Sequence, residues 1–188
     1  MINTLYSLDT LGTPTALFLA LLIGVPLGIL AGYLGGSTDW TISKVTEIFM
    51  GFPLLLFLVA IGYTVGLRLS AVTLGIFQPG VLSLLFLIGI FSWFMPARVI
   101  RAQVLALREE QFVEAARMVG SSNWRIIRSH IFPHLVGPLI VLATLNVAAF
   151  ILAEAGLSFL GLGIQLPTAS WGNLLADAPQ YYTSRPLL

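Results

Sequence analysis

Long apolar runs separated by short polar connections make up most of the chain. The first run, 15–34, has 20 residues and no charge, which is the length that a helix needs to cross about 30 Å of hydrocarbon. Comparable runs predict further spans at about 48–67, 81–97 and 135–152. The pattern therefore predicts an all-α membrane protein with about four transmembrane helices.

The composition supports this class. Of the 188 residues, 57% are hydrophobic and 9% are charged, and the mean hydropathy is +0.96. Ordinary soluble domains carry about 25% charged residues, and a small soluble domain cannot hide so much apolar surface. The chain has no cysteine, which excludes disulfides and thiol catalysis. The stretch Met1 to Asp9 has no basic region, so no cleavable signal peptide is expected.

Basic residues gather in one segment, 98–132, between the third and fourth expected spans. It holds six of the nine Lys and Arg of the chain: Arg98, Arg101, Arg108, Arg117, Arg125 and Arg128. Such a concentration marks the cytoplasmic side of a membrane protein. Alternation of the spans then places both ends of the chain on the non-cytoplasmic side. The net charge of +1 gives no indication of a nucleic-acid partner, because these residues act as topology signals.

The basic segment is patterned as two helices around a glycine. Residues 102–119 favour a first helix with one apolar stripe, formed by Leu105, Phe112 and Val119 at heptad spacing. Gly120 is placed to cap its C-terminus, where a positive φ is needed.

A second short helix is expected directly after this glycine. Ser121 or Ser122 can cap its N-terminus, and Pro133 is expected to end it. One face of this helix carries Trp124, Ile127 and Ile131.

Two interpretations of this helix pair remain open. The small residues Ala115, Ala116 and Gly120 leave a shallow knob that can enter a cleft on a partner, where Arg117, Arg125 and Arg128 can pair with acids. Alternatively, the pair rests on the membrane surface, and its arginines interact with anionic headgroups.

Other features have a structural and a functional interpretation. Gly24, Gly28 and Gly32 repeat every four residues in the first span, which predicts close packing of another helix. Asn146 is expected to form a hydrogen bond between helices, and Glu154 at the end of a span is a candidate substrate contact.

Two further stretches complete the sequence hypotheses. Residues 156–163 are too short to cross a membrane and predict an interfacial segment, either a gate or a packed helix. His130 and His134 have metal-ligand spacing, but Pro133 lies between them and no third ligand is near, so no metal site is expected.

The segment Glu114-Ala115-Ala116, with Gly120 and the ending His130-Ile131-Phe132-Pro133, resembles the EAA motif of ABC importer permeases. The run Glu154 to Gly163, followed by Pro167 and Ser170-Trp171-Gly172, is similar to the signature of the C-type permease subunit in the dipeptide, oligopeptide and nickel branch. The resemblance covers most of the chain.

This resemblance implies one partial type I ABC importer transmembrane domain over 1–188, without the family's first and last transmembrane helices. It implies a multi-pass subunit of a bacterial or archaeal inner membrane. The helix pair would be the coupling helix, with an ATPase-coupling set of Glu114, Ala115, Ala116, Arg117, Gly120, Arg125, Arg128 and Pro133. Asn146, Glu154, Ser158 and Phe159 are expected to line the pathway or gate.

The implied partners are a B-type second permease subunit forming a heterodimer, two cytoplasmic ATP-binding subunits, an extracytoplasmic substrate-binding protein and the lipid bilayer. No cofactor is expected on this chain, and ATP would be hydrolysed by the partner subunits, because the sequence has no phosphate-binding loop of the form GxxxxGK[ST]. The expected cargo is peptide or a related substrate such as nickel.

Two other classes of function stay open from the residues alone. The first is a self-contained channel or secondary transporter, which would show charged or broken helices near the midplane in both halves. The second is a membrane scaffold whose basic segment binds a cytoplasmic partner without transport.

Overall fold

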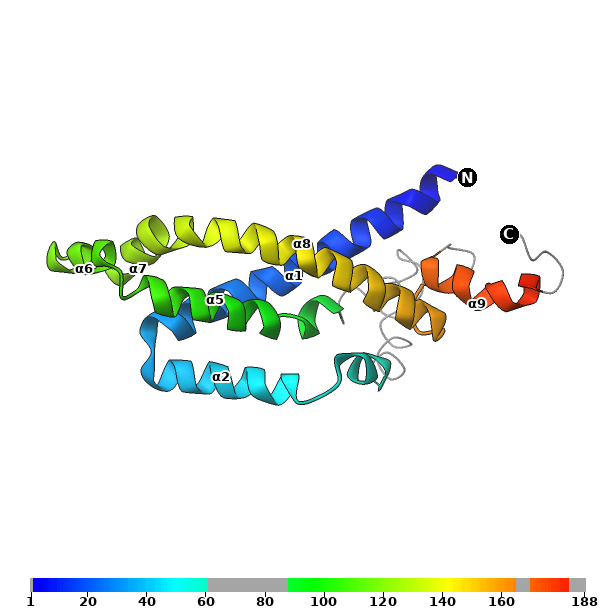
Figure 1. Ribbon diagram of the computed structural model, residues 1–188, viewed down its shortest axis with the longest axis horizontal. Helices are drawn as coiled ribbons and strands as arrows, with labels where there is room; N and C mark the ends of the chain where they lie inside the picture. Colours follow the sequence, from blue (N-terminus) through cyan, green and yellow to red (C-terminus); the bar gives the residue numbers. More distant parts are fainter. Residues whose placement is uncertain (1, 61–87, 165–169, 183–188) are drawn as a thin grey trace, which may run out of the picture. The chain divides into compact units, whose positions relative to one another are not determined.

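A computed structural model describes residues 2–60, 88–164 and 170–182, and the regular elements among these residues are all helices, with no strand. The labelled elements are α1 (Ile2–Leu34), α2 (Gly36–Met50), α5 (Phe94–Leu107), α6 (Gln111–Met118), α7 (Asn123–Ile126), the π-helix η1 (Ile127–Ile131), α8 (Phe132–Phe159) and α9 (Trp171–Tyr182) (Figure 1). They form two compact units: 1–17, 53–90 and 147–188 in the first, and 18–52 and 91–146 in the second.

Three described helices are long and apolar enough to cross a membrane: Thr13–Leu34, Ile88–Leu107 and Asn123–Phe159. A fourth span results if Gly36–Met50 and Leu54–Ala60 together form one broken span. The expected spans 15–34 and 135–152 lie within the first and third of these helices. Parts of the other two, 61–67 and 81–87, lie outside the described residues.

The sequence pattern predicts that the third span, 81–97, ends ten residues before the helix does. Pro96 does not end the helix, because it lies in the first turn of α5, where a backbone N–H has no helical acceptor. The helix continues to Leu107, so the basic segment 98–132 begins inside α5. It contains the end of α5, all of α6, α7 and η1, and the start of α8.

The single helix expected over 102–119 is also wrong, because the chain breaks between Leu107 and Gln111. Glu110 has extended backbone dihedrals, φ −74° and ψ 147°. The break has a packing reason. Val104 and Val113 are both fully buried, but a continuous helix turning about 100° per residue would place them on opposite faces. The interruption lets both valines enter the same core.

Pro133 does not end the second helix of the pair, contrary to expectation. The wide turn of η1 leads directly into α8, and the Phe132 N–H donates to the Ile127 carbonyl, five residues back. A proline ring normally clashes with the carbonyl four residues earlier. Here the wide turn precedes the ring, and Pro133 lies in the first turn of α8, so the helix continues.

Three glycines place α1 directly against α5, as their spacing predicted. A Cβ on Gly24 would lie 2.5 Å from the Trp93 carbonyl oxygen, and one on Gly28 would lie 2.5 Å from that of Ala97. A Cβ on Gly32 would lie 2.8 Å from the Val104 Cβ. Only hydrogen fits at these positions. The adjoining core joins both helices to the segment that follows α5 and contains Ile29, Tyr33, Ile100, Val104, Val113, Ile126, Ile127, Ile131 and Leu135.

The expected interfacial segment 156–163 is not a separate element. Its first four residues complete α8, and Gly161 ends the helix at φ 76°. The N–H of Gly161 donates to the Ser158 carbonyl at 3.0 Å, and that of Leu162 to the Leu157 carbonyl at 2.9 Å. These two bonds satisfy carbonyls that a helix end otherwise leaves unpaired.

Candidate functional site

The segment of α6 and α7 forms a helical hairpin that turns at Gly120, which we call the hairpin (residues 111–126). Gly120 has φ 81°, its N–H donates to the Arg117 carbonyl at 2.9 Å, and the Ser121 N–H donates to the Ala116 carbonyl at 3.0 Å. This is the Schellman arrangement, which needs a residue with positive φ. The predicted cap at Gly120 is confirmed.

Ser122 begins the second arm of the hairpin. Its backbone is extended, and its hydroxyl accepts a hydrogen bond from the Arg125 N–H at 3.4 Å. A serine in this position satisfies one of the donors left free at a helix start. Of the two serines considered from the sequence, Ser122 is the cap.

The inner side of the hairpin is packed into the core. Val113 on α6 and Ile126 on α7 have no exposed surface, and neither does Ile131 on η1. The Phe112 ring stacks on the His134 ring, with centroids 4.9 Å apart and planes inclined by 11°. Both helices of the hairpin are therefore packed against the core.

The predicted apolar faces of the hairpin are partly wrong. Val119, expected in the stripe with Leu105 and Phe112, is 87% exposed. Trp124, expected on the face of Ile127 and Ile131, is 70% exposed. Because the chain breaks before α6, the side chains of α6 do not continue the helical repeat of α5. The apolar stripe predicted over 102–119 therefore does not form.

The outer end of the hairpin is an exposed, mainly apolar tip, formed by Ala115, Met118, Val119 and Gly120. Met118 is 79% exposed, and a Cβ on Gly120 would find nothing within 4 Å. Ala115 and Glu114 are exposed, whereas Ala116 is half-buried. An apolar tip of small and flexible side chains on a packed base is suited to entering a cleft.

Tyr33, at the end of α1, contacts both arms of the hairpin. Its hydroxyl donates to Asn123 Oδ1 at 3.1 Å, and the Arg117 guanidinium lies over its ring, 5.6 Å from the centroid. The side chain is buried. Sequence reasoning missed Tyr33, although a tyrosine at the polar end of an apolar run has a ring to bury and a hydroxyl to pair.

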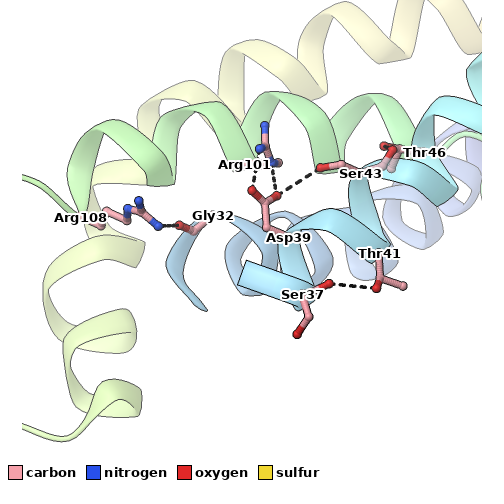
Figure 2. Close-up of polar contacts among 8 residues, drawn as sticks. All are labelled: Gly32, Ser37, Asp39, Thr41, Ser43, Thr46, Arg101 and Arg108. Atoms are coloured by element: carbon pink, nitrogen blue, oxygen red, sulfur yellow. Dashed lines mark hydrogen bonds and ion pairs between the residues drawn. The ribbon is translucent and has the colours of Figure 1, made fainter. Parts of the chain in front are cut away.

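A second polar connection joins α2 and the end of α1 to α5 (Figure 2). Asp39 accepts from Arg101 through both oxygens, from Nε to Oδ1 and from Nη2 to Oδ2 at 2.7 Å, and it also accepts from the Ser43 hydroxyl at 3.1 Å. Arg108 Nη1 donates to the Gly32 carbonyl at 3.1 Å. Bidentate arginine–carboxylate pairs fix geometry as well as charge.

The expected pathway residues lie in the other unit or at its border, and most are engaged within the chain. The Asn146 amide donates to the Leu142 carbonyl at 2.8 Å, within α8, and the expected bond to another helix stays a prediction. An amide in a long apolar helix satisfies its donor on the nearest carbonyl of the previous turn. Phe159 is 53% exposed.

Ser158 is the centre of a closed polar network. It is 2% exposed, donates to Glu154 Oε1 at 2.7 Å and accepts from the Ile164 N–H at 3.0 Å. Asn173 Nδ2 donates to the Ile164 carbonyl at 2.8 Å. The network joins the end of α8 to the start of α9.

Comparison with known proteins supports one family. The model of the binding-protein-dependent transport system inner membrane component family matches residues 24–183. The chain belongs to this family. The match includes the hairpin, the Asp39–Arg101 pair and the Ser158 network.

Curated relatives of this family align with most of the chain. The dipeptide transport system permease protein DppC of Alkalihalophilus pseudofirmus is 39% identical over 167 residues, 89% of this chain and 51% of that protein. The nickel transport system permease protein NikC of Escherichia coli K12 is 35% identical over 171 residues, 91% of this chain and 57% of that protein. The oligopeptide transport system permease protein OppC of Haemophilus influenzae is 37% identical over 171 residues, 91% of this chain and 51% of that protein.

The chain thus spans about half the length of the curated relatives it matches. Family membership and the apolar helices make it a multi-pass inner-membrane protein with the helical fold of a type I ABC importer transmembrane domain.

Proposed function

We propose that the chain is a permease subunit of an ATP-driven, binding-protein-dependent importer of peptides or related cargo such as nickel. It acts with a B-type second permease subunit, two cytoplasmic ATP-binding subunits and an extracytoplasmic substrate-binding protein. The family match and the functions of the relatives, which transport dipeptides, oligopeptides and nickel, support this proposal.

The observation that carries the proposal is the exposed apolar tip on a base that is fully packed. Met118 and Val119 are 79% and 87% exposed, while Val113 and Ile126 beneath them have no exposed surface. Burial of one large aliphatic side chain contributes roughly 1.5–3 kcal/mol. Insertion of the tip into a groove of an ATP-binding subunit therefore supplies affinity without refolding of the hairpin.

The polar connections at the hairpin base provide the route by which movement reaches the spans. The Tyr33 contacts join both arms to α1, and the Asp39–Arg101 pair joins α2 to α5. When ATP binding closes the two ATP-binding subunits, the hairpin, α1, α2 and α5 respond as connected elements. The pore between the two permease subunits then opens alternately to each side.

In this proposal the chain hydrolyses no ATP, and the binding protein selects most of the cargo. Glu154 and Ser158 hold the α8–α9 connection. Phe159, which is 53% exposed, is therefore the best remaining candidate of the expected set for a pathway contact.

The test is co-purification of the chain with candidate ATP-binding subunits. Val119→Asp and Ala115→Glu each place a charge on the exposed tip. Each should reduce recovery of the ATP-binding subunit at least roughly tenfold, because an unpaired charge would be buried in the interface. Both residues are exposed in the chain, so folding should be unaffected.

The matched control is Gln103→Glu, which adds one negative charge at an exposed position of α5. It should leave recovery unchanged. Equal recovery with both tip variants and this control would refute docking through the hairpin and would favour a tip that faces lipid headgroups.

A further inference from the structure

A groove of about 570 Å³ lies beside the base of the hairpin, away from its tip. Val25, Pro26 and Leu30 of α1 form one side. Trp124, Arg128 and Phe132, from α7, η1 and the start of α8, form the other. The open flank is apolar, because Leu30, Phe132 and Trp124 are 40%, 44% and 70% exposed.

Arg128 is the one charged residue that lines this groove. Three other arginines of the basic segment have partners: Arg101 pairs with Asp39, Arg108 bonds to Gly32 and Glu109, and Arg117 lies on Tyr33. Among the described residues the Arg125 side chain has no such partner, but it does not line the groove. The Arg128 side chain is exposed at the mouth of the groove. Within the described residues, its guanidinium has no ion-pair or hydrogen-bond partner. A single unpaired cation therefore stands at one end of an otherwise apolar depression.

We propose that this groove binds one anionic phospholipid from the leaflet on the hairpin side. The phosphate accepts hydrogen bonds from the Arg128 guanidinium, and an acyl chain lies along Val25, Pro26 and Leu30. Basic pockets between membrane helices bind anionic headgroups in this manner. Trp124 at the rim is the side-chain type that prefers the headgroup level.

Charge complementarity selects a lipid over a protein helix as the occupant. A helix packed into an apolar groove has to supply an acid opposite Arg128, or it leaves a cation buried without a partner. A phospholipid supplies the anion and the apolar segment in one molecule. The distance along α1 from Val25 to Leu30, about 7.5 Å at 1.5 Å per residue, accommodates the upper part of an acyl chain.

The test is lipid binding by the purified full chain in neutral detergent, which needs no ATP-binding subunit and is therefore independent of transport. The probes are phosphatidylglycerol and phosphatidylcholine with identical acyl chains, measured by native mass spectrometry. Arg128→Gln should weaken phosphatidylglycerol binding roughly tenfold, because a charge-assisted hydrogen bond to phosphate is lost. Phosphatidylcholine binding should change less.

Arg125→Gln is the matched control, since Arg125 is exposed on the adjoining turn but does not line the groove. It should change phosphatidylglycerol binding by less than about twofold, because exposed charges at a distance are screened. A second variant, Leu30→Glu, places an acid on the exposed rim and should also weaken phosphatidylglycerol selectively. It keeps the test decisive if Arg128→Gln folds poorly.

Equal binding of the two lipids by the unmodified chain would overturn the proposal, as would equal losses with Arg128→Gln and Arg125→Gln. A photocrosslinker at Leu30 in intact membranes should react with lipid. Reaction with a protein subunit instead would assign the groove to a protein interface and would also overturn the lipid site.

Discussion

The hairpin and the α8–α9 connection both turn at a glycine, but their surroundings differ. Gly120 and Gly161 have φ 81° and 76°, and each is followed by the same pair of backbone hydrogen bonds. Beside Gly120, Val119 is 87% exposed. Beside Gly161, Leu160 is 53% exposed, but Ser158 in the preceding helical turn is 2% exposed and bonded to Ile164. One turn presents a surface and the other closes a junction, although both lie in segments that resemble family motifs.

The comparison also separates two uses of glycine. Gly120 supplies a backbone conformation in open space, while Gly28 supplies room for a neighbouring helix. At Gly120 a side chain would meet no neighbour, but the positive φ would strain it. The second leaves no room at all.

The largest expected effect tests this packing. Gly28→Ala places a Cβ 2.5 Å from the Ala97 carbonyl oxygen, so α1 and α5 must separate, at about 2–3 kcal/mol. The measurement is the apparent free energy of unfolding in detergent. Gly156→Ala is the control, since its Cβ would make an ordinary 3.6 Å contact with Leu55. It should be neutral or stabilising by up to about 1 kcal/mol, and similar losses in both variants would contradict close packing at Gly28.

The next effect tests the closed junction. Ser158→Ala leaves the buried Ile164 N–H without its acceptor, so we expect a loss of about 1–3 kcal/mol. Hydrogen exchange at Ile164 should also accelerate. Thr144→Ala removes an exposed hydroxyl that bonds within its own helix, and this control should cost no more than about 0.5 kcal/mol. Unchanged exchange at Ile164 would show that the junction does not depend on Ser158.

A smaller effect is expected from the connection between α2 and α5. A double-mutant cycle with Asp39→Asn and Arg101→Gln should give a coupling free energy of about 1 kcal/mol, because this pair is bidentate and partly shielded. The same cycle at the exposed Lys44–Glu47 pair should give little measurable coupling. The account of α2 as connected to α5 fails if the two cycles give equal values.

Much of this arrangement is predictable from local sequence. The spacing of Gly24, Gly28 and Gly32 indicates a close helix contact. Gly120 followed by Ser122 indicates the C-terminal cap of one helix, a turn and the N-terminal cap of the next helix. These features depend on backbone sterics within a few residues. The glycine spacing does not predict which helix packs against it, and the structure shows that this helix is α5.

The helix boundaries in the basic segment were not predictable by the same means. No glycine or proline lies between Leu107 and Gln111, and the break there allows Val104 and Val113 to share one core. Pro133 predicts a helix end that the structure does not have, because the η1 turn accommodates the proline ring. The contacts of Tyr33 and Asp39 join residues more than 60 positions apart, which no local period reveals.

The central claim is that the hairpin tip docks on an ATP-binding subunit, and the cysteine-free sequence allows a direct measurement. Val119→Cys introduces the single thiol of the chain at a position that is 87% exposed. Its rate of maleimide labelling should be high in the isolated chain and should fall at least roughly tenfold in the complex, as expected for a residue buried at an interface core. Gln103→Cys should label equally in both states. Equal labelling of Val119→Cys with and without the ATP-binding subunits would contradict the account.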